Sequence, residues 1–267
     1  MDKIVWWNIN TGGAKRLTDR LTAVFDRLTT CGAAVIGLSE AGQVVQPAIR
    51  EFARSNGYTT IARGGLSARK GVSLLVHDSL KTSDVSVGDE LRSDNKIVGQ
   101  WVGMVVEGLC AEPVLVASVY NYCHHGAGLA DSVAAAAHRL SNGAVIAGGD
   151  WNFSRTCDGT PEGAGCGTPA FQRLERELGW VNVLPVDQAG LSREMPSWPT
   201  HAGRSIPRLP RQLDQVFADA ETARCLSVSV DGNNFRHHGK YLSDHAILAA
   251  SIIPDGLTPS RGASPGR

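Results

Sequence analysis

The sequence predicts an α/β fold in which two mixed β-sheets pack face to face with helices outside. Short apolar runs typical of buried strands alternate with segments of helical periodicity, and this alternation occurs in both halves of the chain. No stretch rich in Pro, Gly or Ser separates the halves. Each half therefore supplies a sheet with its own covering helices, in one continuous unit.

The first half begins with a strand from Ile4 to Ile9, which is apolar, rich in β-branched and aromatic residues, and followed by Thr11-Gly12-Gly13. A helix follows, because apolar residues recur at three and four positions between Leu17 and Leu28. A second helix is predicted from Pro47 to Ser55. Further strands are predicted at residues 33–38, 58–62, 71–77, 97–106 and 113–120.

The second half begins with an Ala-rich helix from Asp131 to Leu140 and a buried strand from Gly143 to Gly148. Another helix is marked by Phe171, Leu174, Leu178 and Trp180. Later strands are predicted at residues 212–217, 224–230 and 245–253. Residues 254–267 are rich in Pro, Gly and Ser and predict a disordered tail, which leaves residues 1–253 as the folded domain.

The composition is that of an ordinary globular protein, with 42% hydrophobic and 19% charged residues. Lys and Arg balance Asp and Glu at 26 each, so the net charge gives no reason to expect tight nonspecific binding to a polyanion. The six cysteines include no CxxC pair, which argues against a zinc cluster. The N-terminus lacks the pattern of a signal peptide, so we expect a cytoplasmic protein with reduced thiols.

Polar side chains recur where predicted strands end. They are Asn8, Asn10, Glu40, Tyr120, Asp150, Asn152, Asp214, Asp244 and His245. Because neighbouring strand ends can meet at one rim, these side chains can form a single cluster. Carboxylate and amide oxygens suit Mg²⁺, with Mn²⁺ as a substitute, whereas zinc is a poorer match for this set.

Six short motifs then occur in an order and spacing that resemble the endonuclease/exonuclease/phosphatase superfamily, which includes DNase I-like nucleases. They are WNIN (7–10), SEAG (39–42), SVYNY (118–122), GDWN (149–152), LDQVF (213–217) and SDH (243–245). The matches extend over nearly the whole chain. The resemblance implies a four-layered α/β sandwich whose active site lies at one rim.

The resemblance also implies roles for individual residues. Glu40 would be a metal ligand with Asn8 beside it, and Asp244 a second carboxylate on the metal side. Asp150 would orient or deprotonate the attacking water. The remaining roles concern the phosphate: Asn152 would position it, Tyr120 would contact it, and His245, oriented by Asp214, would stabilise its charge.

Two positions leave alternatives open. Tyr120 is our choice for the polar residue of its strand, but Tyr122, His124 and His125 lie close by. Asn10 stands where relatives carry an acidic residue, so we expect it to contact substrate rather than metal.

Basic residues gather before two of the motifs. Arg204, Arg208 and Arg211 precede Asp214, while Arg236, His237, His238 and Lys240 precede Asp244. Such runs are usually solvated loops, but their position also fits a local phosphate-binding rim, for which Arg208, Arg211 and His238 are the candidates.

The predicted function is a metal-dependent nuclease that hydrolyses phosphodiester bonds in DNA or RNA. The first alternative is a phosphatase or phosphodiesterase acting on a small or lipid-linked phosphate, because the same chemistry serves many esters. The second is a binding module without turnover, against which the intact polar set argues. We expect a monomer.

Overall fold

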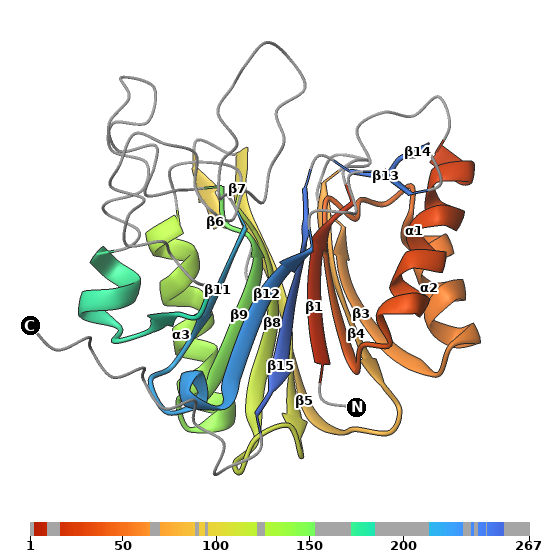
Figure 1. Ribbon diagram of the computed structural model, residues 1–267. Coiled ribbons are helices and arrows are strands. Elements are labelled where there is room, and N and C mark those ends of the chain that lie inside the picture. Colours follow the sequence, from red (N-terminus) through yellow and green to blue (C-terminus); the bar gives the residue numbers. More distant parts are fainter. Residues whose placement is uncertain are drawn as a thin grey trace, which may run out of the picture.

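The computed structural model shows two β-sheets packed face to face, with helices on both outer faces (Figure 1). This four-layered α/β sandwich confirms the predicted fold class. The structure describes residues 3–9, 17–64, 70–88, 91–93, 96–121, 126–152, 172–184, 214–231, 236–237, 240–243 and 245–253.

The first sheet contains six strands and is built around the two ends of the chain. Its order is β12 (Leu226–Asp231), β15 (Ile247–Ile252), β1 (Lys3–Asn8), β2 (Val35–Ser39), β4 (Gly71–His77) and β3 (Tyr58–Gly64). Strands β1 and β2 are parallel, whereas β1 pairs with β15 in the antiparallel sense. Two helices, α1 (Leu17–Cys31) and α2 (Gln46–Ser55), cover its outer face (Figure 1).

The second sheet contains seven strands from the middle of the chain. Its order is β10 (Val181–Asn182), β11 (Asp214–Ala218), β9 (Val145–Asp150), β8 (Val114–Asn121), β7 (Lys96–Glu107) and β5 (Lys81–Val87), while β6 (Leu91–Ser93) also pairs with β7. Strands β8 and β9 are parallel and are joined by α3 (Gly126–Ser141), just as α1 joins β1 to β2. A separate two-stranded ribbon consists of β13 (Arg236–His237) and β14 (Lys240–Tyr241).

Burial explains why the central strands read as continuous apolar runs. One apolar cluster fills the space between the sheets, and two others lie under the helices on either side. A central strand such as β8 is therefore buried along its whole length, on both faces. None of the helices in the described ranges is long and apolar enough to span a membrane.

The Trp6 side chain spans the interface between the two sheets. Its indole Nε1 donates to the carbonyl of Ala117 on the facing sheet, at 3.0 Å. The ring occupies space left by glycines, because a Cβ atom on Gly148 would lie 2.4 Å from it. Gly148 therefore allows a large aromatic side chain to enter the interface beside the end of β9.

The structure differs from the sequence prediction at several elements. Helix α3 begins at Gly126 rather than at residue 131. The helix predicted around residues 171–180 is a single π-helical turn, η3 (Gln172–Glu177), in which the Leu178 N–H donates to the carbonyl of Arg173 at 2.9 Å. Strands β5, β6, β10, β13 and β14 were not predicted. The predicted tail lies outside the described residues.

Candidate active site

Four strand ends meet at one rim of the sandwich. Asn8 is the last residue of β1, and Glu40 directly follows β2, which runs parallel to β1. In the facing sheet, Tyr120 and Asp150 lie opposite each other near the ends of the parallel strands β8 and β9. The parallel pair in each sheet therefore delivers its polar ends to the same place.

Two antiparallel strands start at this rim and complete the cluster. Asp214 is the first residue of β11 and pairs directly with Asp150. His245 precedes β15, which runs antiparallel to β1. The ligand atoms of Asp150, Asp214 and His245 all lie within 4.8 Å of one another.

Asn8 connects the two sheets through its side-chain amide. Its Nδ2 donates to Asp150 Oδ2 at 2.8 Å and lies 3.4 Å from Glu40 Oε1. The hydroxyl of Tyr120 donates to the same Glu40 oxygen at 3.1 Å. Two carboxylates, an amide and a phenol are thus linked across the interface.

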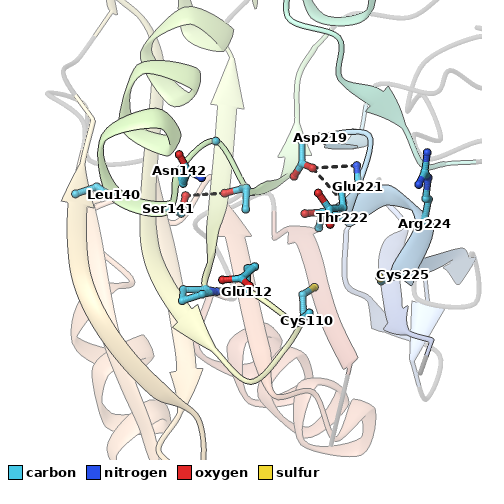
Figure 2. A pocket seen from close by; sticks show the side chains of 14 residues that line it. Cys110, Glu112, Leu140, Ser141, Asn142, Asp219, Glu221, Thr222, Arg224 and Cys225 are labelled. Carbon is cyan, nitrogen blue, oxygen red and sulfur yellow. Dashed lines mark hydrogen bonds between the residues drawn. The ribbon is translucent and has the colours of Figure 1, made fainter. Parts of the chain in front are cut away.

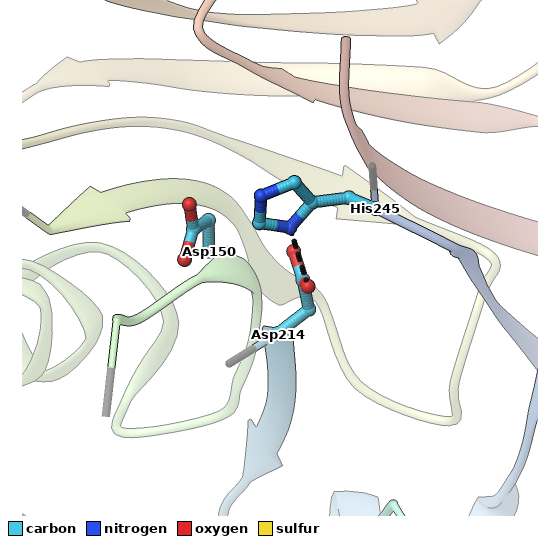
Figure 3. Close-up of side chains that lie close together, drawn as sticks. All are labelled: Asp150, Asp214 and His245. Atoms are coloured by element: carbon cyan, nitrogen blue, oxygen red, sulfur yellow. Dashed lines mark hydrogen bonds and ion pairs between the residues drawn. The ribbon is translucent and has the colours of Figure 1, made fainter. Parts of the chain in front are cut away.

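His245 and Asp214 form a buried hydrogen-bonded pair. His245 Nδ1 lies 2.8 Å from Asp214 Oδ2, and both side chains are almost fully buried. Figure 3 shows the other side of the imidazole ring turned toward Asp150. The carboxylate therefore fixes the ring orientation and leaves Nε2 for chemistry on the side of Asp150.

The pKa of the Asp150 carboxyl is shifted by its surroundings. Burial raises its pKa to about 8; His245 opposes this shift, and the nearby charges of Asp214 and Glu40 reinforce it. In the metal-free protein, burial therefore favours the protonated form of Asp150. Positive charge bound beside it favours the ionised form.

Backbone strain also gathers at the site. Glu40 and Asn152 have φ angles of 54° and 51°, in the left-handed region that side chains disfavour. The Asn152 N–H donates to Asp150 Oδ1 at 3.0 Å, and its side chain donates to the carbonyl of Asn121 at 2.5 Å. These hydrogen bonds hold the strained turn after β9 in place.

Comparison with known proteins assigns a family. The model of the endonuclease/exonuclease/phosphatase family matches residues 5–245. The chain belongs to this family. Its members are divalent-metal-dependent hydrolases of phosphoric esters. No curated protein sequence matches the chain significantly.

Several solved structures of family enzymes share the fold. A 3′-5′ exonuclease from Neisseria meningitidis superposes with a TM-score of 0.67 at 20% identity, over 94% of this chain and 99% of that one. An AP endonuclease from Archaeoglobus fulgidus gives a TM-score of 0.67 at 18% identity, over 94% and 99%. Truncated TDP2 from Caenorhabditis elegans gives 0.65 at 14% identity, over 94% and 97%.

The residues at the rim fit the divalent cation that the family requires. The atoms beside Asn8 that could bind a cation are the carboxylate oxygens of Glu40 and Asp150. Glu40 is only partly buried. Oxygen ligands from carboxylates and amides are those that hard cations such as Mg²⁺ prefer. The Asp150–Asp214–His245 group is a second place where ligand atoms converge.

The structure brings together seven of the residues selected from the sequence, namely Asn8, Glu40, Tyr120, Asp150, Asn152, Asp214 and His245. The others, Asn10, Arg208, Arg211, His238 and Asp244, lie outside the described residues, as do the alternatives Tyr122, His124 and His125. Trp151, which directly follows Asp150, is fully buried against Phe217 with ring centroids 5.4 Å apart.

Ser243 is a contributor that the sequence analysis quoted in a motif but gave no role. Its hydroxyl donates to the carbonyl of Asn8 at 2.6 Å and accepts the N–H of His245 at 3.1 Å. The Trp7 indole donates to the carbonyl of His245 at 3.0 Å. No local pattern could reveal the hydrogen bonds of Ser243 with Asn8 and of Trp7 with His245, because they join residues more than 230 positions apart.

A cavity of about 710 Å³ lies at the opposite end of the sandwich (Figure 2). Its lining includes residues just before β8 and β9, whereas the candidate site lies at the far ends of these strands. Asp219 in its wall already accepts the N–H groups of Thr222 and Val145. The cavity is therefore separate from the cluster that carries the chemistry.

Proposed function

We propose that this family member is a nuclease that hydrolyses phosphodiester bonds in DNA or RNA by metal-assisted, in-line attack of water. The observation that carries the proposal is the position of Asp150. Its carboxyl accepts from Asn8 on the Glu40 side and lies within 4.8 Å of the Asp214–His245 pair. A phosphate bound there would meet a cation on one side and a histidine on the other.

In this mechanism Asp150 orients the water and takes its proton as the new bond to phosphorus forms, while the bond to the leaving oxygen breaks on the opposite side. Asn152 and Tyr120 position the phosphate. His245, held by Asp214, neutralises the negative charge that builds up on the phosphoryl group. Glu40, Asn8 and Asp244 would hold the divalent cation, which when bound would polarise the phosphoryl oxygens.

Several finer assignments belong to the same proposal. The cation is Mg²⁺, with Mn²⁺ as a substitute, and the substrate is a nucleic acid that Asn10, Arg208, Arg211 and His238 help to bind. Residues 1–253 form the catalytic domain. The protein is a cytoplasmic monomer. Relatives of the same fold include an exonuclease and an AP endonuclease, which supports the choice of a nucleic acid.

A second candidate is a phosphatase or phosphodiesterase for a small or lipid-linked phosphate. The equal numbers of basic and acidic residues favour it, because a protein without excess positive charge attracts a long polyanion weakly.

Hydrolysis assays decide between these functions. The purified protein is incubated with plasmid DNA, structured RNA or bis(p-nitrophenyl) phosphate, with Mg²⁺ or Mn²⁺, and with EDTA as a control. Cleavage of a nucleic acid that is lost in EDTA and in Asp150→Ala and His245→Ala supports the nuclease. Turnover of the small ester alone supports the second candidate, and no turnover of any ester argues for a binding module.

A further inference from the structure

Gln100 continues the row of β7 side chains that point between the two sheets. Val102, Met104 and Val106 belong to the apolar cluster between the sheets, whereas Trp101 belongs to the cluster under α3. Because side chains alternate along a strand, Gln100 faces the same way as Val102. It is a polar side chain next to three apolar ones in this row.

Strand pairing places this residue at the rim of the candidate site. Gln100 pairs directly with Tyr120 of β8. Side chains of directly paired residues lie on the same face, with Cβ atoms about 4.5–5.5 Å apart. Tyr120 in turn donates to Glu40. Tyr120 therefore lies between Gln100 on β7 and Glu40, the carboxylate that we assign to the metal.

The carboxamide of Gln100 has no hydrogen-bond partner in the part of the chain that the structure describes. Neither its Nε2 nor its Oε1 forms a hydrogen bond there, although the side chain is fully buried. Buried polar groups are normally satisfied, because an unpaired donor or acceptor destabilises the fold. The polar groups of Asn8 and Tyr120 are hydrogen-bonded, whereas Asn121 Oδ1, next to Tyr120, also lacks a partner among the described residues.

Burial does not separate Gln100 from the site. Asn8 is 0% exposed, Asp150 2% and Tyr120 5%, so three residues that we assign to the site are as deeply buried as Gln100, although Glu40 is only partly buried. Any opening that admits a substrate to Tyr120 also brings it beside Gln100.

We infer that Gln100 determines substrate specificity by binding the nucleotide that lies on the Tyr120 side of the scissile phosphate. This inference rests on the proposed nuclease function. The amide can donate from Nε2 and accept at Oε1, so its complete partner must offer both an acceptor and a donor. A phosphate dianion or diester lacks the donor. A nucleobase edge or a sugar hydroxyl offers both.

The test compares Gln100→Met with the wild type, because methionine keeps the length of the side chain without its polar ends. Thr60→Val is the matched control, because Thr60 Oγ1 is also buried without a partner among the described residues. Thr60 pairs with Leu75, which packs in the cluster under α1 and α2 rather than between the sheets. We expect both variants to raise the melting temperature, Gln100→Met by roughly 2–6 °C. Only Gln100→Met raises KM for the oligonucleotide substrate, by about tenfold.

Substrate variants identify the group that binds. An abasic analogue at the flanking nucleotide, or a change between deoxyribose and ribose there, should remove the difference in KM between wild type and Gln100→Met. The first result identifies the base edge, and the second a sugar hydroxyl. Hydrolysis of bis(p-nitrophenyl) phosphate, which lacks both groups, should be the same in the two proteins.

Two results would overturn the inference while leaving the nuclease function intact. One is an unchanged KM in Gln100→Met on every oligonucleotide; the other is a fall in melting temperature with equal losses on both kinds of substrate, which indicates a structural role. If the wild type cleaves no nucleic acid, the proposed function itself fails, and the inference with it.

Discussion

Ionisation of the buried Asp150 carboxyl lowers the stability of the metal-free protein. Its pKa in the folded protein is raised to about 8, whereas an Asp in an unfolded chain titrates near 4. Between these values the folded state binds more protons than the unfolded state. The free energy of unfolding of the metal-free protein therefore falls as the pH rises from about 4 to about 8, by at most about 1.4 kcal/mol per unit.

Asp150→Asn tests this directly, because asparagine has nearly the same shape and does not titrate. We expect the melting temperature of the variant minus that of the wild type to be larger by several degrees at pH 8 than at pH 5, in EDTA. Thermal melts of both proteins at the two pH values provide the measurement. An equal difference at both values would show that Asp150 does not carry this pH dependence.

Glu40 and Tyr120 predict graded effects on the metal requirement. Glu40→Gln removes the charge that we assign to cation binding, and we expect the Mg²⁺ concentration for half-maximal activity to rise about 100-fold. Tyr120→Phe removes only the hydroxyl that donates to Glu40, so the rise should be about tenfold. Mg²⁺ titrations of hydrolysis check both values. A Glu40→Gln enzyme with an unchanged Mg²⁺ requirement would contradict the assignment of Glu40.

The sequence alone could place the ends of the central strands but not the bonds between them. Asn8, Glu40, Asp150 and Asp214 follow or begin apolar runs, and an ordered set of motifs makes them stand out. The position of Gln100 beside Tyr120 depends on strand register, which no local pattern reveals.

Among the elements, β9 is the one whose packing most directly positions the site. A methyl group on Gly148 would enter the Trp6 ring, and one on Gly149, with φ of 132°, would lie 2.3 Å from the Val119 carbonyl oxygen. Both glycines immediately precede Asp150. The close contacts of β9 with Trp6 and with β8 therefore determine where the carboxylate lies.

We expect Gly148→Ala to lower the free energy of unfolding by about 1–3 kcal/mol, because overpacking a tight interface displaces its neighbours. A smaller ring should relieve the clash, so Trp6→Phe and Gly148→Ala together should cost less than the sum of the single changes. Urea denaturation of the four proteins measures the coupling. Strict additivity would show that Trp6 and Gly148 do not share this space.

Elements with strong local signals were predicted, and weak or contradictory signals account for the rest. Strand β5 reads KTSDVSV and has exposed residues, such as Val85, so it lacks the continuous apolar run of a buried strand. Helix α3 begins with Gly126-Ala-Gly128, and glycine disfavours helix, so its first turn depends on packing that the sequence does not display.

At the scale of the whole molecule, the domain boundary is open to test. Strand β15 ends at Ile252, and the Ile253 N–H donates to the carbonyl of Cys225 at 2.8 Å, which is the last described hydrogen bond of the chain. We expect a protein truncated after residue 253 to keep its melting temperature within about 2 °C, together with its hydrolytic rate. A large fall in the melting temperature or in the hydrolytic rate would show that residues 254–267 belong to the folded, catalytic domain.

The pairing of β1 with β15 joins Lys3 to Ser251, so the first strand of the chain is completed by the last. During synthesis on the ribosome, β2 is available early to pair with one edge of β1, but the other edge is paired only after β15 has been made, and His245 lies just before that strand. Contacts between such distant positions form slowly. The Asp214–His245 pair of the candidate site therefore forms only after synthesis has passed the start of β15.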